Sequence, residues 1–146
     1  MKIYFDTCSL NRPLDDRAQL RVSLEAEAVL GLLVLCESGD VTLVSSEVLD
    51  LENARNPLPQ RKAFASGVLE CAVSVIAIDE ETKRRAEELE QRGFKAFDAL
   101  HVACAEADRV DYLRTCDDRM LKRARRQTDL AVNVISPLEL VDEISP

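Results

Sequence analysis

The chain has 146 residues, of which 47% are hydrophobic and 32% are charged, and its formal net charge is -8. This length suits one domain with a sizeable core, and the mixture excludes a disordered or fibrous chain. The acidic balance argues against a protein that binds nucleic acid through a uniformly basic surface, although it is compatible with a local basic patch. We therefore expect a single domain over residues 1–146.

The five cysteines are odd in number, widely spaced and set among apolar neighbours. They are typical of reduced, buried thiols in a cytoplasmic protein. The first residues lack the apolar run and cleavage site of a signal peptide, and no later run is long enough to span a bilayer. The sequence predicts a cytoplasmic protein that does not enter a membrane.

Short apolar strands alternate with helices along the chain. In chain order, the patterns predict a strand over 3–5, a turn over 7–10, a helix over 17–38, a strand over 41–44, a helix from 47 that is interrupted at 56–59, a helix over 60–71, a strand over 73–78, a helix over 80–91, a helix over 97–107, a strand over 111–114, a helix over 118–126, a strand over 132–135 and a helix over 138–143. Gly39 fits the end of the first helix, and Ser136-Pro137 fits the start of the last one. Unalternating strands separated by helices predict an α/β fold with a five-stranded parallel sheet covered on both faces.

Acidic residues follow three of the predicted strands, where parallel sheets gather their ligands. These residues are Asp6 after the first strand, Glu47 and Glu52 after the second, and Asp117 and Asp118 after the fourth. Asp98 lies at the head of an apolar helix that can reach the same edge through a right-handed crossover. Each residue alone is more often a helix cap than a catalyst. Their coincidence at one edge indicates a site.

Several carboxylates at one edge need a cation. Two of them about 4 Å apart repel by roughly 4 kcal/mol at an effective dielectric constant of about 20. A set of oxygen ligands without convincing histidine or thiol ligands suits Mg²⁺ or Mn²⁺ better than zinc or copper. Such ions assist the displacement of phosphodiester bonds.

Four stretches of the sequence carry a family resemblance that covers essentially the whole chain. They are Ile3-Tyr4-Phe5-Asp6-Thr7, Val44-Ser45-Ser46 followed by Glu52, Ala96-Phe97-Asp98-Ala99-Leu100-His101-Val102-Ala103, and Leu113-Arg114-Thr115-Cys116-Asp117. The chain resembles the PIN domain family, of which the VapC-type toxins are a branch. The resemblance implies a three-layer α/β/α sandwich around the parallel sheet and a metal-dependent ribonuclease.

The resemblance also implies the site residues. The catalytic acidic quartet would be Asp6, Glu52, Asp98 and Asp117, and the metal ligands among them would be Asp6, Asp98 and Asp117. Glu47 is the alternative to Glu52, and Asp118 is the alternative to Asp117. The hydroxyls of Thr7 and Thr115 would orient a carboxylate or a water, unless they only make hydrogen bonds at strand ends.

His101 lies three residues after Asp98, hence on the same face of the predicted helix. It could be a general base or a donor to a metal ligand, but a lone histidine in an apolar helix is more often a packed residue, so the catalytic set excludes it. Cys8, Cys104 and Cys116 lie near the acidic positions without the spacing of a zinc site.

Five of the eight residues from Arg119 to Arg126 are basic. A charge run is usually a solvated face, but this one adjoins the predicted site, where RNA phosphates would need positive charge. The predicted RNA contacts are Arg12, Arg119, Lys122 and Arg123.

The sequence thus favours a metal-dependent endoribonuclease that hydrolyses RNA, with the family resemblance implying a toxin inhibited by a small antitoxin protein, and a homodimer. The alternative is a non-catalytic PIN-like module that binds RNA or has a regulatory role. A haloacid-dehalogenase-type phosphatase is disfavoured, because Cys8 stands where that chemistry would need a second aspartate.

Overall fold

The main sheet of the computed structural model, which describes residues 1–144, has four parallel strands in the order β2-β1-β5-β6. Ile3, Tyr4, Phe5 and Leu113 are fully buried in this sheet. Burial on both faces explains why the strands show no alternation of polar and apolar residues. The strands are β1 (Lys2–Phe5), β2 (Thr42–Leu43), β3 (Ser45–Ser46), β4 (Val75–Ile76), β5 (Tyr112–Arg114) and β6 (Asn133–Ile135). The predicted α/β fold around a parallel sheet is confirmed.

The extended segment 42–46 changes its pairing partner along its length. Its first half, β2, pairs with β1, and its second half, β3, pairs in parallel with β4. At the change, the N–H of Val44 donates to the carbonyl of Ile3 at 3.0 Å, and the N–H of Ser45 donates to the carbonyl of Ser74 at 2.9 Å. The third predicted strand therefore joins the fold through a separate two-stranded sheet, and the main sheet has four strands instead of five.

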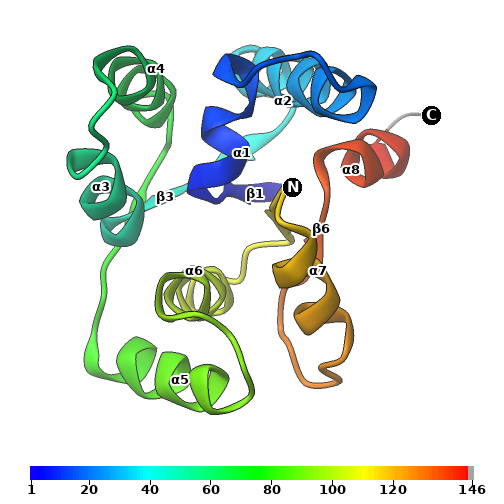
Figure 1. Ribbon diagram of the computed structural model, residues 1–146. Coiled ribbons are helices and arrows are strands. Elements are labelled where there is room, and N and C mark those ends of the chain that lie inside the picture. The colour runs from blue at the N-terminus through cyan, green and yellow to red at the C-terminus, as the bar shows by residue number, and fades with distance from the viewer. Residues whose placement is uncertain (145–146) are drawn as a thin grey trace.

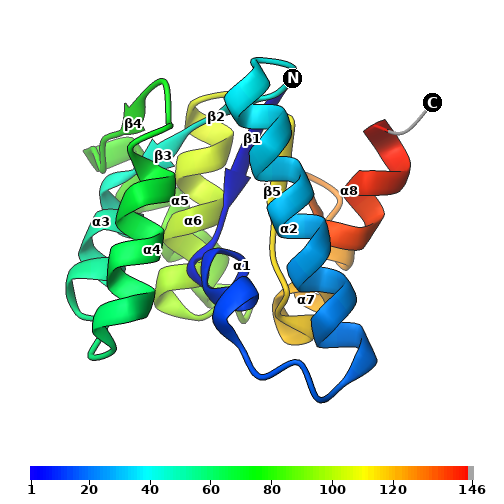
Figure 2. The same cartoon turned by 90° about the horizontal axis from the view of Figure 1, so that it is seen from above.

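Helices cover both faces of the main sheet. Figure 1 shows α1 and α2 on one side of β1 and α6 and α5 on the other, and Figure 2 shows α2 running across β1 and β5. Within residues 1–144, no helix is long and apolar enough to cross a lipid bilayer. The helices are α1 (Thr7–Asn11), the 3-10 turn η1 (Arg12–Leu14), α2 (Leu20–Ser38), α3 (Glu47–Ala54), α4 (Pro59–Leu69), α5 (Glu80–Gln91), α6 (Ala96–Ala107), α7 (Asp118–Arg125) and α8 (Pro137–Ile144).

The chain after β1 differs from the sequence prediction, because α1 occupies the place of the turn predicted over 7–10. Asp6 is its N-cap, and the Oδ1 atom of Asp6 accepts a hydrogen bond from the backbone N–H of Ser9 at 3.0 Å. Such a cap satisfies a backbone donor that the first turn of a helix leaves free. The next helix, α2, begins at Leu20 instead of residue 17 and ends as predicted at Gly39, whose φ is 85°. Glycine adopts this left-handed conformation without strain.

Candidate functional site

A pocket of about 270 Å³ lies beyond the carboxyl ends of β1 and β5. It contains all four members of the predicted acidic quartet, which come from four different segments of the chain. The lining residues are Asp6, Thr7, Cys8, Asn11, Glu52, Asp98, His101 and Asp117. Concentrated carboxylates with a histidine in a concave site are typical of a binding or catalytic centre.

Asp6 directly follows β1 and is almost fully buried. Burial raises the pKa of its carboxyl group, and hydrogen bonds from Thr115, the Ser9 backbone and Cys8 act in the opposite direction. The thiol of Cys8 lies 3.1 and 3.2 Å from the two carboxylate oxygens. Asp6 therefore has a fixed orientation, set by donors from α1 and from the end of β5.

Asp98 lies in the first turn of α6, whose N-cap residue is Lys95. Asp98 is therefore not the N-cap, although its position in the first turn is one that the helix dipole favours for an acidic residue. Burial and the negative charge of Asp6 raise the pKa of Asp98 to about 6, and Asp117 and Glu52 contribute in the same sense. These carboxylates are close enough to affect one another's ionisation, as a shared cation site requires.

Asp117 is the N-cap of α7, and its Oδ1 atom accepts a hydrogen bond from the backbone N–H of Arg119 at 2.9 Å. Its own backbone N–H donates to the hydroxyl of Thr115 at 3.0 Å. Thr115 is fully buried and lies 3.4 Å from the thiol of Cys8. Its hydroxyl thus links the end of β5, the start of α7 and the donors around Asp6.

Glu52 reaches the pocket from α3. Its Oε1 atom accepts a hydrogen bond from the hydroxyl of Thr7 at 2.7 Å and is paired with the Nε2 atom of His101. Burial would raise the pKa of Glu52, but the hydrogen bonds from His101 and Thr7 outweigh it, so the pKa lies below its usual value. The hydrogen bonds from His101 and Thr7 thus favour the ionised form of this partly buried carboxyl group.

The alternative acidic residues lie outside the pocket lining. Glu47 is exposed at the first position of α3, whereas Glu52 lies more than one turn along on the face toward α1. Asp118 forms a two-pronged ion pair with Arg21 of α2, which lowers its pKa. The geometry thus favours Glu52 over Glu47 and Asp117 over Asp118.

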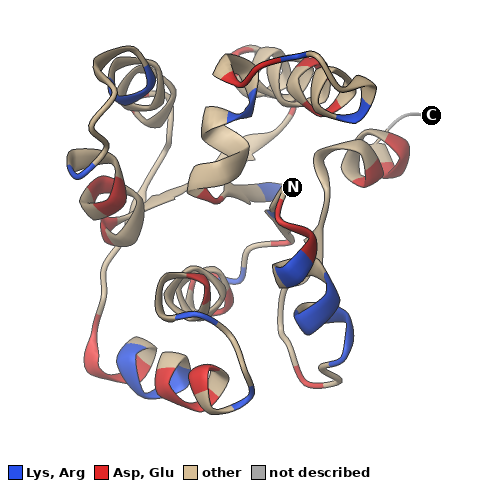
Figure 3. Cartoon of the chain, in the orientation of Figure 1, with Lys and Arg blue, Asp and Glu red and all other residues tan. Residues whose placement is uncertain are grey.

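The predicted basic residues are divided between two places. Arg119 and Lys122 are exposed on α7, and Figure 3 shows blue along that helix, which begins beside the pocket. Arg123 is partly buried on the same helix. Arg12 instead donates to Asp15 at 3.0 Å and lies 3.5 Å from Glu25, so its charge is neutralised by neighbours. Of the four predicted RNA contacts, Arg119 and Lys122 are therefore the ones exposed to solvent.

The carboxylate oxygens fit Mg²⁺ or Mn²⁺ by their chemistry. Within residues 1–144, however, no three His, Cys, Asp or Glu side chains lie close enough together to form a ready-made metal-binding group. Repulsion between ionised carboxylates keeps such groups apart unless a cation offsets it. Burial is the main cause of the raised pKa of Asp98, and the negative charge of Asp6 acts in the same direction.

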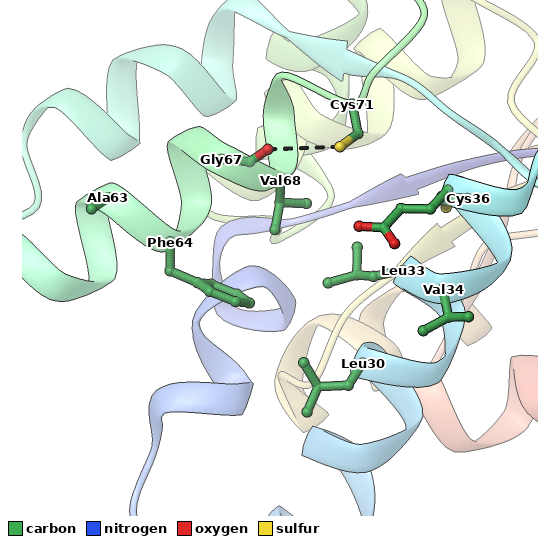
Figure 4. Close-up of a pocket in the computed structure, with 10 residues that line it drawn as sticks. Leu30, Leu33, Val34, Cys36, Ala63, Phe64, Gly67, Val68 and Cys71 are labelled. Atoms are coloured by element: carbon green, nitrogen blue, oxygen red, sulfur yellow. Dashed lines mark hydrogen bonds between the residues drawn. The ribbon is translucent and has the colours of Figure 1, made fainter.

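A larger pocket of about 440 Å³ lies between α2 and α4, away from the carboxylates. Its lining is mostly apolar, and Figure 4 shows Leu30, Leu33 and Val34 of α2 facing Phe64 and Val68 of α4. We assign the chemistry to the smaller pocket, because only that one combines several titratable groups with perturbed pKa values.

The sequence interpretation missed two residues behind the pocket and one within it. Tyr4 and Ser46 are fully buried and connect to His101 through hydrogen bonds, and Asn11 lines the pocket from the end of α1. Tyr4 lies two residues before Asp6 on β1, so alternation places both side chains on one face of the sheet. That periodicity is the signal that could have identified Tyr4.

Comparisons with known proteins agree with this fold. A family model described as PIN domain matches residues 3–127. Among solved structures, the chain is similar to one in the crystal structure of VapBC2 from Rickettsia felis bound to a DNA fragment from their promoter, with a TM-score of 0.62 and 14% sequence identity. That match covers 93% of this chain and 98% of the other. At this identity the likeness shows a shared fold. No curated protein matches the chain.

Proposed function

Because the chain belongs to the PIN domain family, we propose that it is a metal-dependent endoribonuclease that hydrolyses RNA phosphodiester bonds and acts as the toxin of a toxin–antitoxin pair. The observation that carries the proposal is the gathering of Asp6, Glu52, Asp98 and Asp117 in one pocket at the carboxyl end of the sheet. The exposed basic residues of α7 support RNA as the substrate, since they begin beside that pocket.

The four acids would divide the work. Asp6, Asp98 and Asp117 would hold Mg²⁺ or Mn²⁺, which when bound supplies charge neutralisation at the phosphodiester and makes a water more acidic. Glu52, which Thr7 and His101 hold at the pocket, would accept the proton of the attacking water. Thr115 and Cys8 would keep the Asp6 carboxylate in its orientation.

The proposal predicts cleavage of a mixed RNA pool that needs Mg²⁺ or Mn²⁺ and stops on chelation. Asp6→Asn and Asp98→Asn should each reduce the cleavage rate by about 100-fold or more, because each removes a negative charge that would hold the cation in the pocket. Gel analysis of the products at several enzyme concentrations measures the rate.

Two matched controls are available. Glu47→Gln and Asp118→Asn remove the same charge just outside the pocket and should cleave like the wild type. Metal-dependent cleavage that survives Asp6→Asn and Asp98→Asn would contradict the assignment. Binding of RNA without cleavage by any variant would instead identify a non-catalytic RNA-binding module.

An antitoxin would need a docking surface, and the apolar pocket between α2 and α4 offers one. Val34 at its rim is 62% exposed, so Val34→Glu should weaken inhibition by a small partner protein without changing cleavage by the isolated chain.

We further propose a homodimer formed through the helices after β3, which sedimentation velocity would test. The five cysteines are free, which supports a site of action in the reducing cytoplasm.

A further inference from the structure

A buried chain of hydrogen bonds runs from the core to the pocket. The hydroxyls of Ser46 and Tyr4 lie 2.6 Å apart, the hydroxyl of Tyr4 pairs with Nδ1 of His101, and Nε2 of His101 pairs with Oε1 of Glu52. Ser46 and Tyr4 are fully buried, and His101 is 2% exposed. Of these four residues, His101 and Glu52 line the pocket, and Glu52 is the last residue in this chain of hydrogen bonds.

The direction of these hydrogen bonds follows from their two ends. At one end, the backbone N–H of Leu49 donates to the Ser46 hydroxyl oxygen at 3.1 Å, so Ser46 can give its proton to Tyr4. Tyr4 then donates to Nδ1 of His101. At the other end, an ionised carboxylate only accepts, so Nε2 must carry the hydrogen. Every hydrogen bond from Ser46 to Glu52 has one donor and one acceptor when His101 has its single ring proton on Nε2.

The two carboxylate oxygens of Glu52 differ in their hydrogen bonds. His101 and Thr7 both contact Oε1. Among residues 1–144, no hydrogen bond involves Oε2. Two donors on one oxygen fix the rotation of the carboxylate and leave the second oxygen free for a ligand in the pocket.

We propose that His101 is a positioning residue, which the chain from Ser46 through Tyr4 holds in the Nε2–H tautomer so that Glu52 presents Oε2 to the pocket. The part of this inference that concerns cleavage rests on the proposed ribonuclease function. The tautomer of His101 and its dependence on Tyr4 and Glu52 do not rest on that function, because they are properties of the folded protein alone.

The tautomer can be measured directly, since the protein has a single histidine. In protein labelled with ¹⁵N-histidine, the imidazole spectrum should show one protonated nitrogen, Nε2, and one hydrogen-bonded acceptor, Nδ1. Tyr4→Phe should shift the Nδ1 resonance toward that of a free acceptor, and Glu52→Gln should move the Nε2–H resonance. A ring protonated on Nδ1, or on both nitrogens, near neutral pH would overturn the proposal.

Kinetics tests the consequence for Glu52. Tyr4→Phe and His101→Ala should lower kcat about 10-fold or more with little change in KM, the usual effect of losing a group that orients a functional residue. His101→Gln, whose amide can still donate to Glu52, should recover part of that loss. Cys104→Ala trims a buried side chain one turn along α6 and controls for general loosening of the helix.

The outcomes separate the two proposals. If the wild type cleaves RNA but Tyr4→Phe and His101→Ala match Cys104→Ala in kcat, the positioning role is wrong and the ribonuclease stands. If the wild type does not cleave RNA, the ribonuclease proposal fails, and the response of the His101 spectrum to Tyr4→Phe and Glu52→Gln still decides whether the chain sets the tautomer.

Discussion

At the scale of single residues, the Asp98 carboxylate lowers the stability of the fold when no cation is bound, although we propose that it serves the metal site. Its carboxylate is half-buried in the first turn of α6, and burial together with Asp6, Asp117 and Glu52 raises its pKa to about 6, from an ordinary value of 3.8. Without a cation, the folded protein between these two pH values binds more protons than the unfolded chain. Stability therefore falls as the pH rises through this window, and the full penalty applies above it.

Asp98→Asn should remove this penalty. In chelator, we expect the variant to be about 1 kcal/mol more stable than the wild type near pH 7, after allowing for the exposed part of the side chain and the loss of a favourable charge in the first helical turn. The difference should shrink toward pH 4. Urea unfolding at several pH values measures both free energies.

The control for this prediction is Asp118→Asn, because Arg21 lowers the pKa of Asp118 and the charge is favourable there. This variant should gain no stability at neutral pH. Adding Mg²⁺ or Mn²⁺ should stabilise the wild type but not Asp98→Asn, since a ligand stabilises only the state that binds it. Equal stability of Asp98→Asn and the wild type at every pH would contradict the penalty.

At the scale of elements, capping side chains stabilise the starts of three helices around the pocket. Asp6 caps α1, Ser46 caps α3 and Asp117 caps α7. Two of these caps also line the pocket, and the third belongs to the hydrogen-bond chain behind Glu52. A change at a cap therefore alters the start of a helix and the site together.

Two glycines, one within α2 and one at its carboxyl end, allow a test of how this helix ends without changing the pocket. Gly39 has φ of 85°, and Gly31 lies exposed within the helix, with no neighbour within 4 Å of an added Cβ at either position. Gly39→Ala should destabilise the fold by about 1 kcal/mol through backbone strain. Gly31→Ala should stabilise it by up to about 1 kcal/mol through helix propensity. Thermal or urea unfolding measures both, and effects of the same sign would contradict the role of Gly39.

The sequence was sufficient to predict the positions of the acids but not all of their surroundings. Asp6 and Asp117 follow strands, so parallel topology alone places them at one edge. The 7–11 helix was missed because its start depends on the Asp6 side chain, which can cap a helix as readily as it can form a turn. The partner change of segment 42–46 was missed because pairing depends on strands distant in sequence.

At the scale of the whole molecule, charge is separated although the net charge is -8. The acidic pocket adjoins α7 through Asp117, the N-cap of that helix, and Figure 3 shows the basic residues of α7 in blue. Arg114 of β5 is a positive residue in the core, away from the basic helix. It is fully buried, and its guanidinium carbon lies 5.0 Å from the centre of the Phe5 ring. Burial lowers its pKa to about 9. A short strand that ends in arginine gives no sequence signal that the arginine lies in the core.

The separation of charge predicts how RNA binding depends on salt. In the Asp6→Asn background, replacing Arg119 and Lys122 by alanine should weaken RNA binding and reduce the slope of log affinity against log salt by about 1 to 2, one for each lost phosphate contact. Fluorescence anisotropy with labelled RNA measures both. Lys83→Ala on α5 removes an exposed positive charge on a helix outside the pocket lining and should leave the slope unchanged.

The pairing of β1 with β5 determines when the pocket can form during synthesis of the chain. Ile3 pairs with Tyr112, and the N–H of Asp6 donates to the carbonyl of Arg114 at 3.0 Å. β1 leaves the ribosome well before its neighbour β5 and the acid that follows it. A nascent chain therefore carries Asp6 without Asp117 for a time, and the activity that we propose arises only once β5 and Asp117 have emerged and paired with β1.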